Sequence, residues 1–167
     1  MSANFHIAGA PNAIASPMAA GHKKDFLVFS LGNREYGINL EKVQELGSYH
    51  KVVCIADAPE LIAGMLTLRS RRVPVVDLHA MLGSGMKNNS SLADVIIINS
   101  GDRINGIAVD QVIDVVTLGS EQIKTSHVTE SDYVTGVGTL GQRVMVLLDA
   151  KKLMTDFQPG AIETIAA

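Results

Sequence analysis

Residues 25–40 read DFLVFSLGNREYGINL, and this stretch decides the fold. The run Phe26–Leu31 is rich in β-branched and aromatic residues and predicts a strand. The pair Gly32-Asn33 predicts a tight turn, and Arg34–Leu40 predicts a returning strand. We therefore expect a β-hairpin here, followed by a short helical turn over Glu41–Leu46.

The same pattern occurs a second time, 69 residues later, over Val95–Val115. At this spacing five further pairs match: Asp25 and Asp94, Arg34 and Arg103, Gly37 and Gly106, Ile38 and Ile107, and Val43 and Val112. A second pair of segments matches at a spacing of 72 residues: Gly64 and Gly136, Thr67 and Thr139, Arg71 and Arg143, and Asp77 and Asp149. Both segments end in a short helical pattern, at 78–82 and 150–157. The chain is thus interpreted as two copies of a β module, joined by a loop over 83–91.

Small sheets protect their edges by closing into barrels, so we expect a mainly β fold of two barrels side by side with short helices. The single cysteine, Cys54, excludes an internal disulfide and favours a cytoplasmic protein. The first twenty residues lack both the basic start and the unbroken apolar segment of a signal peptide. Residues 1–24 and 159–167 are expected to be flexible tails.

Reactive centres are not evident. The five histidines are far apart, and the nearest pair of metal-ligand types, Asp77 and His79, does not make a site, so we expect no metal and no cofactor. Cys54 lies in an apolar run and is expected to be a buried, inert thiol. Residues 136–141 match the spacing GxGxxG, but a strand-like segment follows instead of a helix, so turns in a barrel explain these glycines better. Asp77, Asp110 and Asp114 are expected to be solvated turn residues or caps.

Two features of the sequence are candidates for contact surfaces with a partner. The basic cluster Arg69–Arg72 is either a solvated turn or a contact patch for an acidic partner. The apolar residues in excess of what two small barrels need predict a groove between the barrels, of the kind that binds a partner. The net charge of −3 argues against nucleic acid as the main partner.

In the order and spacing of its motifs, the chain resembles the CheW-like domain family of bacterial chemotaxis coupling proteins. The resemblance covers residues 25–158 and rests on Leu27–Gly32, Glu35–Ile38, Lys42–Leu46, Pro59, Ile62, Gly64, Leu68-Arg69, Val73–Leu78, Gly106–Asp110 and Tyr133–Gly138.

This resemblance implies two intertwined SH3-like five-stranded barrels, roughly 25–82 and 94–150, and no catalysis. It implies a monomeric, cytoplasmic adaptor that is recruited to membrane receptor arrays. The implied partners are the regulatory domain of the histidine kinase CheA and the cytoplasmic tip of chemoreceptors. Carried over by position, the receptor-facing residues are Val43, Glu45, Arg69, Val109 and Val115. The kinase-facing residues are Gly64 and Arg72.

The chain departs from the family pattern in two places. Ser70 stands where the family usually has glycine after Leu-Arg, and we expect this loss to alter the turn, because serine tolerates positive φ poorly. Arg72 replaces a residue that is commonly apolar. The alternatives are a specialised paralogue that serves a divergent kinase or receptor, a small-barrel nucleic-acid binder, and a hydrolase or transferase that uses Asp77 and His79.

Overall fold

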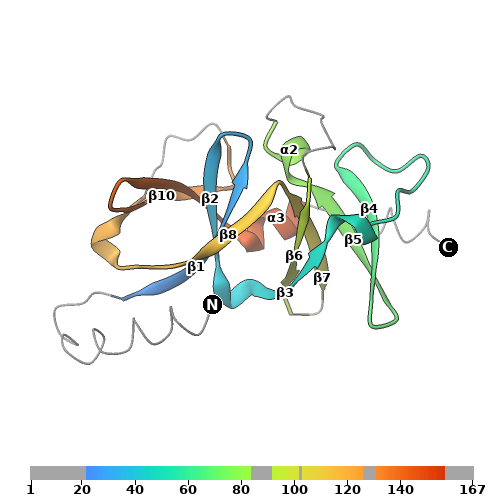
Figure 1. The fold of residues 1–167 in the computed structure, drawn as a ribbon, viewed down its shortest axis with the longest axis horizontal. Helices are drawn as coiled ribbons and strands as arrows, with labels where there is room; N and C mark the ends of the chain where they lie inside the picture. Colours follow the sequence, from blue (N-terminus) through green and yellow to red (C-terminus); the bar gives the residue numbers. More distant parts are fainter. Residues whose placement is uncertain (1–21, 84–91, 102, 126–130, 157–167) are drawn as a thin grey trace.

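The structure, a computed structural model, describes residues 22–83, 92–101, 103–125 and 131–156 (Figure 1). These residues form strands β1 Lys24–Leu31, β2 Arg34–Asn39, β3 Val43–Ser48, β4 Ile62–Leu68, β5 Arg71–Asp77, β6 Asp94–Asn99, β7 Ile104–Val109, β8 Gln111–Leu118, β9 Ile123–Thr125, β10 Val134–Leu140 and β11 Arg143–Leu148. The helices are η1 Leu40–Lys42, η2 Tyr49–Lys51, α2 Leu78–Met81, η4 Ser120–Gln122 and α3 Ala150–Asp156. The predicted mainly β fold with short helices is confirmed.

The strands form two sheets that lie side by side, with α3 between them (Figure 1). The six-stranded sheet has the order β8-β1-β2-β11-β10-β9, and the five-stranded sheet has the order β3-β6-β7-β5-β4. Each half of the chain thus contributes its first hairpin, β1-β2 or β6-β7, to the sheet built mainly by the other half. Neither 25–82 nor 94–150 is a barrel by itself, and parallel pairing of β2 with β11 and of β7 with β5 joins the halves.

The edge strands of each sheet are linked so that both sheets close. In the six-stranded sheet, η4 bends the chain between β8, which pairs with β1, and β9, which pairs with β10. In the five-stranded sheet, η2 follows β3, and Val53 then makes a bridge to Met65 of β4 with two backbone hydrogen bonds of 2.8 Å. The six-stranded sheet has one strand more than the expected five, because the bend at η4 divides one long strand into β8 and β9.

Three apolar clusters account for the unbroken apolar runs in the sequence. One fills the six-stranded sheet and includes Phe26 and Val28, and another fills the five-stranded sheet and includes Val95 and Ile97. The third, which we name the seam core, lies between the sheets and consists of Leu27, Phe29, Leu31, Ile38, Leu78, Ile96, Ile98, Ile107, Val109, Leu148, Ala150, Leu153 and Met154. Successive side chains of a strand point to opposite faces, so β1 and β6 are apolar on both faces because each separates a barrel interior from the seam core.

Two equivalent glycines mark where the chain crosses itself at close range. A Cβ on Gly64 would lie 2.3 Å from the carbonyl oxygen of Val53, and a Cβ on Gly136 would lie 2.4 Å from that of Lys124. Only glycine fits such an approach between backbones. Gly136 to Gly141 therefore belong to β10 and its turn, as predicted, rather than to a dinucleotide site.

Three local predictions need correction. The helical turn predicted over Glu41–Leu46 holds only for Glu41 and Lys42, since η1 ends at Lys42 and β3 begins at Val43, where the chain pairs with β6. Cys54 is exposed rather than buried, because the chain around it lies outside the named strands. Serine at position 70 keeps the positive φ that was expected to be lost with glycine. Arg69 and Ser70 have φ of 48° and 68° in a two-residue turn closed by Leu68 and Arg71.

Some predictions fall outside the described residues. These are most of the two tails and most of the 83–91 loop, although β1 already begins at Lys24. Within the residues that are described, no helix has the length and hydropathy that crossing a membrane requires.

Candidate functional site

The edges of the two sheets carry the residues expected to face a receptor. Val43 lies on β3 and Val115 on β8, which are edge strands of different sheets. Both side chains are half-buried and pack against the seam core. Both residues therefore pack against the same apolar core from different sheets, although they are far apart in the sequence.

Glu45 and Arg69 form an ion pair on the five-stranded sheet. The Nη1 of Arg69 donates to Oε2 of Glu45 over 2.8 Å, and this contact joins β3 to the β4-β5 turn. The Arg69 side chain is 77% exposed and that of Glu45 is 25% exposed, so the guanidinium stays available to a partner. The positive φ of Arg69 and its contact with Glu45 together fix where this cation stands.

Val109 does not share this exposure. It is fully buried on β7 within the seam core, where it supports the surface above it but presents none of its own. Val109 is a member of the seam core against which Val43 and Val115 pack, and its side chain points inward.

The residues expected to face a kinase also differ in exposure. Gly64 is buried at the crossing with Val53, whereas Arg72 is exposed on β5 opposite Thr67. The sequence interpretation missed Val53, which is 68% exposed beside β4, and Leu46, which is 49% exposed on β3. Val53 lies in the apolar run Val52–Ile55, which suggests a core, whereas Leu46 is a single apolar residue between Glu45 and Gly47. For Val53, the proline and the acidic residues that follow within a few positions, at 57–60, were the only hint of a surface segment.

The three aspartates that were expected in turns are tied to specific partners. Asp77 is buried and caps α2, since its Oδ1 accepts from the backbone nitrogens of His79 and Ala80 over 2.9 and 3.4 Å. Asp110 accepts from the backbone nitrogen of Gly32 over 2.7 Å, and its other oxygen lies 2.8 Å from Nε2 of the buried His79. The prediction of a cap is confirmed for Asp77. Asp110 is not a freely solvated turn residue, because it contacts His79.

Arg143 holds two carboxylates at the end of the six-stranded sheet. Its guanidinium contacts Asp114 over 2.9 and 3.0 Å and Glu35 over 2.9 and 3.2 Å. These hydrogen bonds raise the pKa of Arg143 above its ordinary value, and those to Asp114 have a larger effect than those to Glu35. Asp114 occupies the position in the second module that is equivalent to Glu45 in the first. In each sheet this acid pairs with an arginine of the later hairpin, Arg69 with Glu45 and Arg143 with Asp114.

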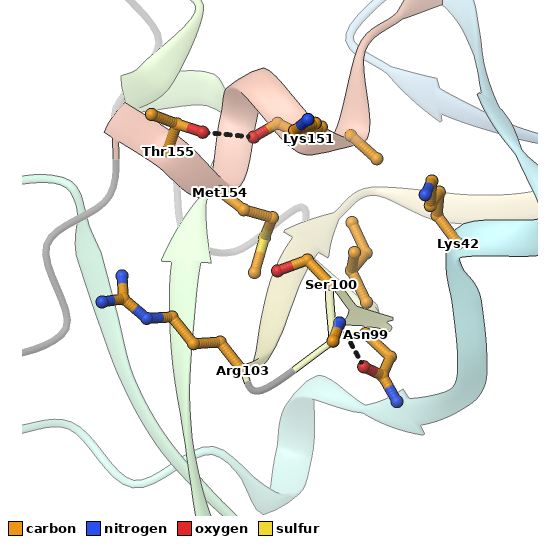
Figure 2. Close-up of a pocket in the computed structure, with 10 residues that line it drawn as sticks. Lys42, Asn99, Ser100, Arg103, Lys151, Met154 and Thr155 are labelled. Carbon is orange, nitrogen blue, oxygen red and sulfur yellow. Dashed lines mark hydrogen bonds between the residues drawn. The ribbon is translucent and has the colours of Figure 1, made fainter.

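In the ranges given above, no group of three His, Cys, Asp or Glu residues is close enough to hold a metal ion. One open hollow of the surface, of about 470 Å³, is lined by Lys42, Ile98, Asn99, Ser100, Gly101, Arg103, Ala150, Lys151, Met154 and Thr155 (Figure 2).

Comparison with known proteins agrees with this architecture. The family model of the CheW-like domain matches residues 25–158, which include nearly all of the described strands. The chain belongs to the CheW-like domain family.

Individual CheW proteins are similar over most of the chain. The chemotaxis protein CheW of Klebsiella aerogenes is 37% identical over 147 residues, which cover 86% of this chain and 89% of that protein. The chemotaxis protein CheW of Treponema pallidum is 30% identical over 151 residues, which cover 83% and 87%. The crystal structure of the scaffolding protein TtCheW from Thermoanaerobacter tengcongensis superposes with a TM-score of 0.68 at 26% identity and covers 76% of this chain and 89% of that one. The CheW-like assignment made from the motifs is confirmed.

Proposed function

We propose that this chain is a non-catalytic scaffold of bacterial chemotaxis that couples chemoreceptors to the histidine kinase CheA. The observation that carries the proposal is the exposed Arg69–Glu45 pair on the same sheet as the half-buried seam residue Val43. Membership of the CheW-like family supports the scaffold role.

The receptor surface would be the apolar seam between β3 and β8, with Arg69 as its charged neighbour. A helix from a receptor tip would pack an apolar stripe against this surface, and its acidic residues would meet the guanidinium. Val43 and Val115 would supply the apolar contact. Val109 would act only by supporting them from below.

The kinase surface would lie on the outer side of the five-stranded sheet. The exposed Val53 and Arg72 flank β4 and β5 there, and the buried Gly64 lets the backbone of residue 53 approach β4. An acidic residue on the kinase would face Arg72, which would narrow the choice of partner. The proposed site of action is the cytoplasm, where the monomeric chain would join receptor arrays.

Such a scaffold acts by holding its partners in a defined arrangement. When one molecule holds receptor and kinase together, the effective concentration of each for the other rises, and their conformational states become coupled. The proposed interfaces are small, so a single anchor residue should change binding measurably.

The variant Arg69→Glu tests the receptor surface. We expect it to weaken binding to a receptor cytoplasmic-tip fragment by about tenfold, because one cation becomes an anion facing the partner. Folding should be unaffected, since an exposed ion pair contributes only about 0–1 kcal/mol. Binding is measured by isothermal titration calorimetry, with Arg34→Glu on a distant hairpin as the matched control.

Binding of the isolated CheA regulatory domain is measured on the same proteins and should not change. Equal retention of the receptor fragment by Arg69→Glu and wild type would contradict the proposed receptor surface. Loss of both partners would show that the two surfaces are not separate.

A further inference from the structure

The side chain of Asn105 is a polar group in an apolar place. Asn105 is 1% exposed on β7, where it shares a strand face with Ile107 and Val109 of the seam core. Among the described residues its side chain makes one hydrogen bond, from Nδ2 to Sδ of Met154 on α3 over 3.8 Å. A thioether sulfur is a weak acceptor, so this buried amide is poorly compensated for its loss of contact with water.

The first module shows that the fold does not require this pair. At the repeat spacings of 69 and 72 residues, Asn105 corresponds to Tyr36 and Met154 to Leu82. Tyr36 and Leu82 are both half-buried and pack against the seam core. An aromatic ring and an aliphatic side chain thus fill in the first module what a buried amide and a thioether fill in the second. The amide beside the sulfur is therefore a particular feature of the second module.

Met154 is buried but borders an open part of the surface. It is 5% exposed, and with Ile98 and Ser100 it lines the open hollow of about 470 Å³. Figure 2 shows its side chain extending from α3 into the space beside Ser100 and Arg103. Met145 differs, because it is 0% exposed and belongs to the cluster that fills the six-stranded sheet. A small solute therefore has a shorter path to Met154 than to Met145.

We propose that Met154 is a site of reversible oxidation, at which hydrogen peroxide converts the thioether to a sulfoxide and Asn105 binds the new oxygen. The sulfur lone pair attacks one peroxide oxygen, the O–O bond breaks, and the other oxygen leaves as water. The sulfur is thereby oxidised by two electrons and the peroxide is reduced by two. In the reverse step a thiol-dependent reductase oxidises two thiols to a disulfide, and the sulfoxide oxygen leaves as water.

Asn105 determines what this oxidation does to the contact between α3 and β7. A sulfoxide in a core ordinarily disrupts packing, because its polar oxygen is buried without a donor. Here the amide already points at the sulfur, and the separation of 3.8 Å leaves room for an oxygen that is bonded to Sδ and lies off the line to Nδ2. The weak hydrogen bond of the reduced form then becomes a strong one. This inference does not depend on the proposed function.

The first test uses the full chain labelled with ¹⁵N, before and after treatment with hydrogen peroxide. Mass spectrometry of tryptic peptides measures oxidation at each methionine, and we expect Met154 to be oxidised before Met145. The proton signals of the Asn105 side-chain amide should then move downfield, as a stronger hydrogen bond requires. Met154→Leu is the matched control, because its other methionines are oxidised as in the wild type and its Asn105 signals should stay in place.

The second test removes the donor with little change of volume, in Asn105→Leu. Oxidation should lower the Tm of this variant by about 2–4 °C more than that of the wild type, because the sulfoxide oxygen then lacks a partner. Treatment of the oxidised wild type with a thiol-dependent methionine sulfoxide reductase should return the Asn105 signals to their starting positions.

Four results would each overturn the proposal. The first is oxidation of Met154 no earlier than Met145. The second is an Asn105 signal that stays in place, or that moves equally in Met154→Leu. The third is an equal loss of Tm on oxidation in Asn105→Leu and the wild type, and the fourth is a sulfoxide at Met154 that the reductase does not remove.

Discussion

At the scale of single residues, the turn between β4 and β5 combines strain with exposure. Arg69 and Ser70 both have positive φ, which non-glycine residues adopt at a cost. Tight two-residue hairpin turns require this conformation, and the paired strands on either side hold the chain in it. The turn thereby presents Arg69 in a fixed position at the expense of stability.

Replacing Ser70 with glycine should relieve that strain. We expect Ser70→Gly to increase the free energy of unfolding by about 1 kcal/mol, because glycine adopts positive φ without a Cβ clash. Urea denaturation followed by circular dichroism measures the change. The same substitution at Ser30, in the extended strand β1, should instead destabilise the protein, and stabilisation of both variants would show that turn strain is not the cause.

Cys54 shows where a residue-level prediction fails. Its neighbours Val52, Val53 and Ile55 form an apolar run, and such runs ordinarily indicate a buried strand. In the structure, Val53 makes only a single bridge to β4, and Val53 and Cys54 both face outward. Composition alone could not separate an apolar contact surface from an apolar core, because both use the same residue types.

At the scale of elements, closure of each barrel depends on a glycine at a backbone crossing. Gly64 and Gly136 occupy equivalent positions, and at each one a Cβ would overlap a carbonyl oxygen. The repeat at 72 residues predicted that these glycines correspond. It did not predict their reason, since the crossing depends on where β3 and β8 bend.

Gly64→Ala should therefore act through the fold. We expect a loss of at least about 1–3 kcal/mol, because a clash with backbone is relieved only by moving the strands apart. Gly32→Ala is the matched control: no atom lies within 4 Å of its added Cβ, so only its φ of 64° opposes alanine. Thermal unfolding compares the two, and an equal or smaller loss at Gly64 would contradict the crossing. An effect of Gly64→Ala on kinase binding is assigned to a lost contact only after this comparison has measured how much the substitution destabilises the fold.

The Arg143 contacts join three strands of the six-stranded sheet, and their removal should weaken it. We expect Arg143→Met to lower the free energy of unfolding by about 1–2 kcal/mol, because Asp114 and Glu35 lose a charged donor at a partly exposed site. Arg143→Lys should recover only part of this, since lysine lacks the fork that reaches both acids. Urea denaturation provides the measurement. If Arg34→Met, on the exposed end of β2, cost as much, the contacts would have no special role.

Element boundaries in the sequence were accurate where apolar runs met turn residues, as at Gly32-Asn33. They were wrong over Val43–Leu46, where the sequence VQEL fits a helix or a strand equally well and pairing with β6 decides. The site residues were carried over from the family pattern and stay a prediction. Their exposure could not be predicted from that pattern, because the burial of Val109 depends on which face of β7 meets the seam core.

At the scale of the whole molecule, the two sheets are held together by exchanged hairpins, the seam core and the hydrogen bonds of Asp110, which we name the polar tie. Asp110 stands where β7 of one sheet passes into β8 of the other, and it binds the β1-β2 turn at Gly32 and His79 of α2. The repeat in the sequence indicated two modules. The exchange of hairpins was implied only by the family resemblance, because a repeat does not say which copy a hairpin pairs with.

Removal of this tie should loosen the contact between the sheets. We expect Asp110→Ala to cost about 1–3 kcal/mol, because the buried His79 and the Gly32 backbone nitrogen each lose a hydrogen-bond partner. Hydrogen exchange followed by mass spectrometry should show faster exchange in the β1-β2 hairpin and α2. The exposed Asp132 supplies the control, and equal exchange in Asp110→Ala and Asp132→Ala would refute the tie.

The central claim is that two separate outer surfaces of one rigid pair of barrels hold two partners at once. Sedimentation velocity on an equimolar mixture of this chain, a receptor cytoplasmic-tip fragment and the CheA regulatory domain tests it directly. We predict one species with the mass of all three components, from which Arg69→Glu removes the receptor fragment alone. Two binary complexes that exclude each other, with no ternary species at any concentration, would contradict the claim.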